Sequence, residues 1–199
     1  RKLLRKSVIA VMLFALLSSF AGSAKAEVQN VKAGNLTLKI PSNWKQSKTT
    51  SQFRLAQFQI PGDQANDEPA ELVVYYFGGG PTGGVKANVQ RWVDQFHPQG
   101  RKLEISSGKS ELGEYVLANI SGTWKKPDGP PFAQKTIDKP GSRVIGVVLM
   151  MPKGDEKEYF FLKLAGPDAV VQRQVDALRT AFAADAVSEK PFELDGAAK

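Results

Sequence analysis

The stretch that decides the fold is residues 144–164, which read VIGVVLMMPKGDEKEYFFLKL. Segments 144–151 and 159–164 are apolar at almost every position, whereas a strand with one solvated face alternates apolar and polar residues. The segment between them, Pro152-Lys153-Gly154-Asp155, has the composition of a turn. We therefore expect an antiparallel hairpin whose two strands are covered on both faces.

The remaining elements are placed outward from this hairpin. Segment 72–77, LVVYYF, is a third strand that is apolar on both faces. Further strand patterns occur at 36–40, 53–60 and 103–105, and a longer alternating one at 115–124. Apolar residues recur at helical spacing in two places, 85–96 and 168–182. The second helix follows Gly166-Pro167-Asp168, a sequence typical of a helix start.

This order of elements predicts one α+β domain over residues 27–184. Runs of consecutive strands favour an antiparallel meander over alternating βαβ units. The expected architecture is a twisted antiparallel sheet of about six to seven strands flanked by two amphipathic helices, in the order βββαββββα. Residues 185–199 lose periodicity, and we expect them to form a mobile C-terminal tail.

The first 26 residues have the three parts of a secretory signal peptide. Arg1 to Lys6 is basic, Ser7 to Phe20 is apolar, and Ala24-Lys25-Ala26 is a small-x-small cleavage site. The apolar run is about 14 residues, against the roughly 20 that span a bilayer, so cleavage is favoured over an uncleaved anchor. We expect the mature protein to begin at Glu27, to be secreted or periplasmic, and to keep no membrane span.

Composition excludes several classes of function. The chain carries 27 Lys and Arg against 20 Asp and Glu, a formal charge of +7. Five of the cations and none of the acids lie in the first 26 residues, so the remainder carries 22 against 20 and is nearly neutral. A nucleic-acid partner therefore loses its electrostatic support. Zero cysteines and one histidine exclude disulfides, thiol nucleophiles and Cys or multi-His metal sites.

A glycine-rich segment follows the 72–77 strand. Residues 78–83, GGGPTG, match the G-x-G-x-x-G pattern, and Glu104 lies where a ribose-binding acid would stand. The match lies in a meander, and Pro81 removes one backbone donor. A flexible connection is therefore favoured over a small-anion or carbohydrate contact through Gly80 and Thr82, and both are favoured over a dinucleotide site. We expect no cofactor.

The strongest candidate binding segment is a proline-rich flap at residues 125–142. Aromatic and basic side chains gather in and beside it, and a mixture of this kind can bind a glycan, an anionic polymer or a partner protein. The candidate residues are Trp124, Lys125, Lys126, Phe132 and Lys135. The alternative is a lid whose Trp124 and Phe132 pack on the sheet while the lysines face water.

Catalytic candidates are weak. One group of acids surrounds the loop before the 72–77 strand, and another occupies the turn of the decisive hairpin. They are Asp63, Asp67, Glu68 and Glu71, and Asp155, Glu156 and Glu158. Paired carboxylates can hydrolyse glycosides or bind calcium, but neither group has calcium-loop spacing. His97 follows the first helix, where a cation is favourable, and no G-x-S-x-G nucleophile accompanies it. We predict no catalytic residues and no metal site.

The order of elements, together with the step from strand to turn at Ile40-Pro41-Ser42-Asn43-Trp44 and the closing helix, resembles the PsbP-like fold, which includes the DcrB-like bacterial envelope proteins. The resemblance covers residues 35–184. It implies a sheet with flanking helices and a binding or assembly role without catalysis. It transfers no ligand residue. Trp44 and Trp92 are expected in the core.

These observations predict an exported, non-catalytic protein that binds a partner protein, a glycan or another ligand through the flap and the glycine-rich segment. Two alternatives remain open at this point. One is a secreted hydrolase that uses a carboxylate pair, which requires two buried carboxylates in one cleft. The other is an assembly factor for another exported complex. A flat surface with exposed aromatics around residues 124–135 would favour binding of a partner protein.

Overall fold

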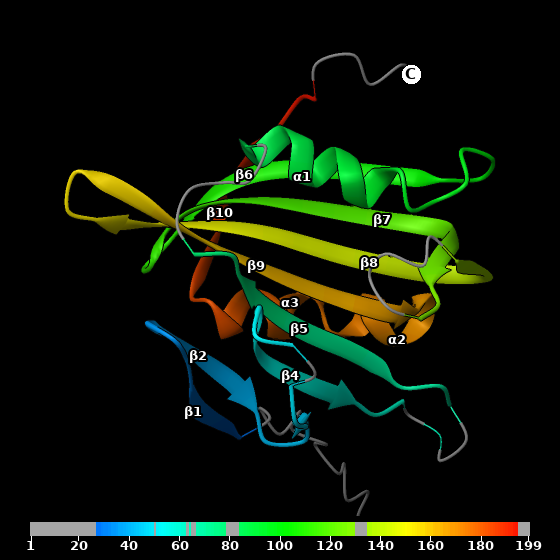
Figure 1. The fold of residues 1–199 in the computed structure, drawn as a ribbon, viewed down its shortest axis with the longest axis horizontal. Helices are drawn as coiled ribbons and strands as arrows, with labels where there is room; N and C mark the ends of the chain where they lie inside the picture. Colours follow the sequence, from blue (N-terminus) through cyan, green and yellow to red (C-terminus); the bar gives the residue numbers. More distant parts are fainter. Residues whose placement is uncertain are drawn as a thin grey trace, which may run out of the picture.

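The computed structural model describes residues 27–49, 51–62, 64, 67–78, 84–129 and 135–194. These residues form one α+β domain with an eight-stranded antiparallel sheet, a separate two-stranded sheet and three short helices (Figure 1). The predicted fold class is confirmed, although the main sheet has more strands than predicted. The proposed signal peptide, residues 1–26, lies outside the described ranges.

The main sheet contains the strands in a spatial order that differs from their order in the chain. That order is β10 (Ala184–Pro191), β6 (Lys102–Ser110), β7 (Gly113–Pro127), β8 (Thr136–Lys153), β9 (Glu156–Pro167), β5 (Ala70–Tyr76), β4 (Arg54–Ile60) and β3 (Lys45–Gln46). The small sheet pairs β1 (Val28–Ala33) with β2 (Leu36–Pro41). The helices are α1 (Gly84–Val93), α2 (Asp168–Arg173) and α3 (Val175–Ala181).

The decisive hairpin is formed by β8 and β9. Lys153 pairs with Glu156 across the turn, where Gly154 has a φ of 61°, a conformation that favours glycine. Strand β5 lies on the other side of β9, so the three strands that are apolar on both faces are neighbours inside the sheet. Both of their faces are buried, as their composition requires.

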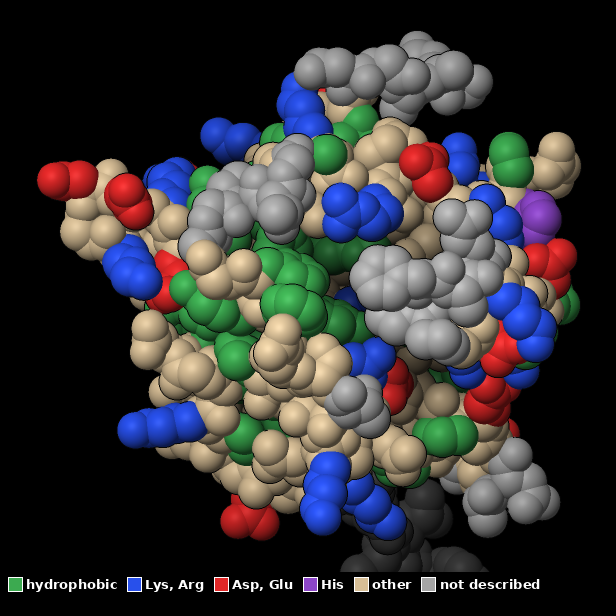
Figure 2. Space-filling view, in the orientation of Figure 1, with side chains coloured by type: hydrophobic (Ala, Val, Ile, Leu, Met, Phe, Trp, Pro, Cys, Tyr) green, Lys and Arg blue, Asp and Glu red, His purple; other side chains and the backbone are tan. Residues whose placement is uncertain are grey.

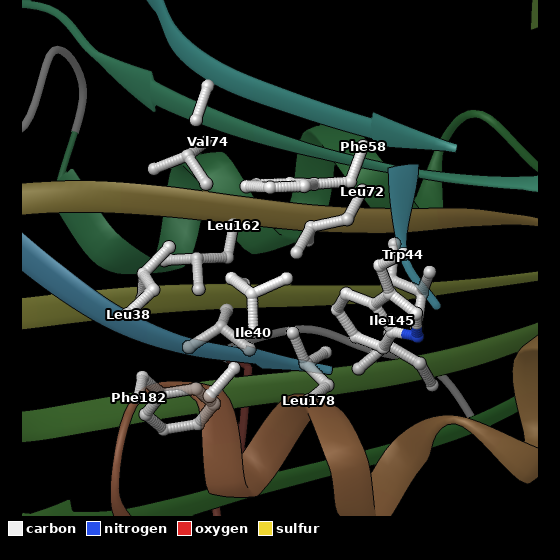
Figure 3. Packing of buried hydrophobic residues seen from close by; sticks show 14 of the residues in the cluster. Leu38, Ile40, Trp44, Phe58, Leu72, Val74, Ile145, Leu162, Leu178 and Phe182 are labelled. Atoms are coloured by element: carbon white, nitrogen blue, oxygen red, sulfur yellow. The ribbon is translucent and has the colours of Figure 1, made fainter. Parts of the chain in front are cut away.

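One face is covered by β1, β2, α2 and α3. In Figure 3, Leu38 and Ile40 of β2 lie between Leu162 of the sheet and Phe182, which follows α3. The opposite face is covered by α1, whose Val89, Trp92 and Val93 are buried against the sheet together with Leu194 near the C-terminus. Trp44 and Trp92 are both buried, so their prediction as core residues is confirmed.

Two predictions near the C-terminus are wrong. The closing helix is divided into α2 and α3 at Gln174. Residues 185–191 of the predicted mobile tail belong to β10, which pairs with β6. Glu189 of β10 accepts hydrogen bonds from Arg179 (2.7 Å) and from the buried Tyr115 (2.9 Å), and these contacts fasten the strand to the domain. Of the predicted tail, residues 195–199 lie outside the described part.

The predicted flap is largely a β-hairpin. Strands β7 and β8 continue beyond the body of the sheet, with Trp124 paired to Lys139 and Pro127 paired to Thr136. We call residues 123–129 and 135–141 the arm. The register of the two strands shifts between Gly122 and Trp124, opposite Pro140 and Gly141, so Pro140 lies at a bulge, and Pro127 lies at the end of β7. Residues 130–134, including Phe132, are outside the described ranges.

Glu158 joins the small sheet to the hairpin. This buried carboxylate accepts hydrogen bonds from Tyr76 (2.7 Å), Lys153 (3.1 Å) and Asn35 (3.4 Å). The Tyr76 hydroxyl contributes most to holding the pKa of Glu158 below its ordinary value of 4.5; desolvation acts against this shift, and Lys153 and Asn35 reinforce it.

The lowered pKa of Glu158 predicts acid sensitivity. The ionised carboxylate stabilises the fold above the unfolded-state pKa, and that stability is lost as the pH falls through the lower folded-state pKa. In urea unfolding between pH 7 and pH 3, the free energy of unfolding of Glu158→Gln should fall less steeply than that of the wild type. Parallel pH profiles would contradict this assignment.

Candidate functional site

A pocket of about 590 Å³ opens at the base of the arm, within the volume range of small-ligand sites. We call it the arm-base pocket. Its floor includes Val73 of β5 with Lys163 and Ala165 of β9, and one wall is formed by Trp124 and Lys126 of the arm. It lies on the sheet face that carries α1. In Figure 2, hydrophobic side chains gather in the middle of this face, with charged side chains around them.

The position of Trp124 depends on the bulge in the arm. The pairing of β6 with β7 ends at Lys102 and Ser121. Beyond that point, the segment just after α1 makes backbone contacts with this side of β7. Lys125 donates its backbone N–H to the Gln95 carbonyl (2.7 Å), and Phe96 forms a β-bridge with Trp124. Trp124 is consequently buried between the end of α1 and the pocket.

Lys163 is the most unusual residue in the pocket. It is half-buried within a strand of aromatic and aliphatic residues, with Val73 and Gly146 as its neighbours in the sheet. Its Nζ donates to Gln95 Oε1 at 2.6 Å and lies 5.0 Å from the centre of a Trp124 ring. Within the described part of the chain, no carboxylate lies within ion-pair distance of this ammonium.

The electrostatic surroundings of Lys163 leave its charge weakly compensated. Desolvation lowers the pKa of Lys163 to about 8. The Glu71 carboxylate raises this pKa and the Arg54 guanidinium lowers it, so the effects of these two charges oppose each other. A cation removed from water without an anion beside it is costly. It is therefore a group that an anionic ligand can satisfy.

Arg54 and Glu71 are held in place through Gln57. Arg54 donates to the Gln57 side-chain oxygen at 2.9 Å, and the Gln57 amide donates to Glu71 at 2.6 Å. The Arg54 guanidinium also lies 5.6 Å from the centre of the Tyr75 ring. Burial is the main cause that raises the pKa of Tyr75, so its phenol stays neutral at physiological pH. This network fixes the side of the pocket that β4 and β5 form.

Glu68 connects the arm to the segment before β5. Its carboxylate lies 3.8 Å from the Lys126 Nζ and 3.4 Å from the Lys139 Nζ. All three side chains are at least 40% exposed, so these ion pairs are worth little individually and can rearrange around a ligand.

The pocket carries a positive excess. Its charged lining residues are Arg54, Glu68, Glu71, Lys126, Lys139 and Lys163. Four of these are cations and two are carboxylates. The surrounding surface adds polar groups, including Gln59 and Ser142, to the apolar Val73 and Ala165. The arrangement suits a polar molecule that carries negative charge.

The structure places some of the site residues predicted from the sequence in the pocket and others away from it. Trp124 and Lys126 line the pocket. Lys125 is not among the lining residues, because side chains of successive strand residues point to opposite faces. Lys135 is exposed and pairs with Asp128 at 2.5 Å. Phe132, Gly80 and Thr82 lie outside the described ranges. His97 makes an exposed pair with Asp138 (2.9 Å) on the arm.

Sequence reasoning missed Lys163, Arg54 and Tyr75. A signal for Lys163 was available, because a lysine within a strand that is otherwise apolar on both faces must be buried at least in part. The contribution of β4 was not visible, because the hydrogen bond from Gln57 to Glu71 depends on the register between β4 and β5, in which Gln57 lies opposite Val73.

In the described part of the chain, the acidic residues predicted from the sequence take part in separate contacts. No group of three or more His, Asp or Glu side chains is placed there to hold a metal ion. Glu68 is paired with two lysines, Glu71 with Gln57, and Glu158 belongs to the contact between the two sheets. Asp63 is outside the described residues.

No family model matches this chain, and a comparison with curated proteins gives no match. The resemblance to the PsbP-like fold therefore stays a prediction. None of the helices in the described ranges has the length and apolar character needed to cross a bilayer.

Proposed function

We propose that this chain is an exported, non-catalytic binding protein whose ligand site is the arm-base pocket. The observation that carries the proposal is the pocket itself, a volume of about 590 Å³ lined by Trp124, Tyr75 and an excess of cations. Export is inferred from the basic, apolar and small-x-small segments of residues 1–26.

The site favours a small ligand, or one end of a glycan, over a flat protein surface. Small-molecule sites are concave and carry a few placed polar groups, whereas stable protein partners bury about 800 Å² on each side of a flatter interface. Binding is also favoured over hydrolysis. The two carboxylates in the pocket, Glu68 and Glu71, are each held by neighbouring side chains rather than placed as an acid and base pair.

Ligand capture tests this proposal. The purified protein is incubated with small-molecule and glycan extracts, passed through a desalting column and denatured, and the released compounds are identified by mass spectrometry. Ala165→Leu fills the pocket floor, and Ala169→Leu makes the same change at an exposed position on α2. We expect the wild type and Ala169→Leu to retain the same compound and Ala165→Leu to lose most of it.

Two results would contradict the proposal. One is the absence of any retained compound from the wild type. The other is equal retention by Ala165→Leu, provided that this variant melts cooperatively near the wild-type temperature. If Ala165→Leu fails to fold, Lys126→Ser and Lys139→Ser together replace it, since both side chains are substantially exposed and line the same pocket.

A further inference from the structure

We infer that the ligand is a hydroxylated carboxylate, of the uronic acid class, and that its carboxylate binds directly to the ammonium of Lys163. This inference rests on the proposed function and deepens it. It assigns the ligand chemistry and the residue that recognises it.

The ammonium of Lys163 has no anionic partner in the described part of the chain. Its Nζ is held by an uncharged partner, Gln95 Oε1, and by the face of Trp124. An ammonium has three donors, and in the described part of the chain none of them reaches a carboxylate. Charged groups buried in proteins are normally paired. Because Lys163 lines the pocket, a ligand entering that pocket can supply the missing anion.

The net charge at the pocket floor indicates the charge of the ligand. Close to Lys163, Arg54 and Glu71 have opposite effects, so the lysine adds about one unit of net positive charge to the floor. A carboxylate matches one ammonium. The rest of the positive excess, Lys126 and Lys139 against Glu68, lies at the exposed rim, so a phosphate dianion at the floor would bring a second negative charge that no floor cation matches. The local charge therefore favours a monoanion.

The hydrogen-bond acceptors around the pocket indicate that the ligand carries hydroxyl groups. Glu68, Glu71, Gln59 and Ser142 offer oxygens that accept hydrogen bonds from hydroxyl groups. Glu68 is held at the rim only by exposed lysines, so it can exchange those contacts for a ligand hydroxyl. A hydroxylated acid satisfies both the cation at the floor and the acceptors around it.

The architecture keeps Lys163 in place without filling the pocket. On one side, Trp92 of α1 lies directly over Gly146, the sheet neighbour of Lys163. On the other side, the pocket is open above Val73 and Ala165. The half-buried lysine thus stands where the cover provided by α1 ends, and it is reachable from the pocket.

The test compares three sugars that share one scaffold: glucuronate, its neutral amide glucuronamide, and glucose 6-phosphate. Binding to the purified protein is measured by calorimetry at pH 7. We expect glucuronate to bind at least tenfold more tightly than glucuronamide and more tightly than glucose 6-phosphate. Equal affinity for the acid and the amide, tighter binding of the phosphate, or no binding of glucuronate would overturn the assignment.

Two lysine variants identify the contact. Lys163→Met removes the ammonium with little change of volume, and Lys157→Met makes the same change at an exposed position on the same strand. We expect Lys163→Met to weaken glucuronate binding at least tenfold and Lys157→Met to leave it unchanged. Unchanged binding of glucuronate by Lys163→Met would show that Lys163 does not contact the ligand.

Thermal melting of the ligand-free variants separates a binding role from a purely structural one. If Lys163 is kept for a ligand, replacing a desolvated cation by an apolar side chain should leave the melting temperature unchanged or raise it. If its role is only to hold Gln95 and Trp124, Lys163→Met should melt several degrees lower, and that result would overturn the inference.

The pocket-filling variant distinguishes this inference from the proposed function. If a neutral sugar binds the wild type and Lys163→Met equally but does not bind Ala165→Leu, the pocket is a ligand site and the anion assignment is wrong. If glucuronate binds Ala165→Leu as it binds the wild type, the pocket itself is wrongly assigned.

Discussion

Replacing Trp44 with alanine is expected to lower the free energy of unfolding by about 3–5 kcal/mol, the usual cost of truncating a large buried aromatic residue. Trp44 is 1% exposed and belongs to the core between the main sheet and the layer of β1, β2, α2 and α3 (Figure 3). Its indole N–H donates to Gln174 at 3.3 Å, at the point where the closing helix is divided. The loss therefore combines a cavity with an unpaired side chain.

Urea unfolding followed by fluorescence and circular dichroism measures this effect. The matched control is Trp44→Phe, which keeps most of the apolar volume and removes the hydrogen bond to Gln174. Its loss should be clearly smaller than that of Trp44→Ala. A loss below about 1 kcal/mol for Trp44→Ala, the range of ordinary surface substitutions, would mean that Trp44 does not hold the two layers together.

Gly146→Ala is expected to have the second large effect. A Cβ at Gly146 would lie 2.2 Å from the Trp92 ring, so the ring and α1 must move away from the sheet. Overpacking of this kind costs about 1–3 kcal/mol, and occasionally more. Because Gly146 is the sheet neighbour of Lys163, the same substitution should also weaken ligand binding in the arm-base pocket.

The double variant Gly146→Ala with Trp92→Leu tests the cause. If the clash with the Trp92 ring produces the loss, the smaller side chain should relieve it, and the double variant should be more stable than the sum of the single changes predicts. Simple additivity of the two losses would show that Gly146 is required for another reason.

The central elements of the fold could be predicted because their signals are local. Strands β5, β8 and β9 are predicted from segments that are apolar on both faces and too short to be buried helices, residues 72–77, 144–151 and 159–164. The turn between β8 and β9 and the apolar spacing of α1 are likewise contained in short segments. Each of these elements is determined mainly by residues within it.

The elements that were missed depend on distant partners. Strand β10, with sequence ADAVSEKP, has no strong alternation and is held by the contacts of Glu189 with Arg179 and Tyr115. The arm was interpreted as a loop because of its prolines, but pairing across the bulge places Pro140 where no ladder hydrogen bond is needed. Long-range pairing decides both cases.

The candidate site likewise combines residues predictable from local sequence with residues that depend on distant partners. Trp124 and Lys126 were recognised because aromatic and basic residues are adjacent in one segment. Lys163 and Arg54 enter the pocket from β9 and β4, which the sheet order brings together. Lys135 was included by composition alone, and its exposed pair with Asp128 places it outside the pocket lining. The pocket required the strand order as well as the composition.

The local charge of this pocket differs from the net charge of the protein. Residues 27–199 are nearly neutral, with 22 Lys and Arg against 20 acids. The pocket nevertheless gathers four cations and two carboxylates. Recognition of an anion thus depends on local placement rather than on net charge, and a small ligand is favoured over a long polyanion.

Proton uptake on binding tests the central claim, that the Lys163 ammonium is the anion contact. The charged groups around Lys163 are Glu71 and Arg54 on the sheet, and Glu68, Lys126 and Lys139 at the rim; Trp92, Gly146, Gln95 and Trp124 bring no charge. Burial raises the pKa of Tyr75, so its phenol is neutral at pH 8. Lys163, with a pKa of about 8, changes its protonation near this pH.

A bound carboxylate favours the ammonium and raises its pKa, so the affinity for glucuronate should fall as the pH rises through 8. The decisive measurement is calorimetric titration of glucuronate at pH 8 in two buffers that differ in ionisation enthalpy. The wild type should take up about half a proton for each molecule bound, because a group at its pKa is half protonated, and Lys163→Met should take up none. Heats that do not depend on the buffer, or equal uptake by the variant, would contradict the account.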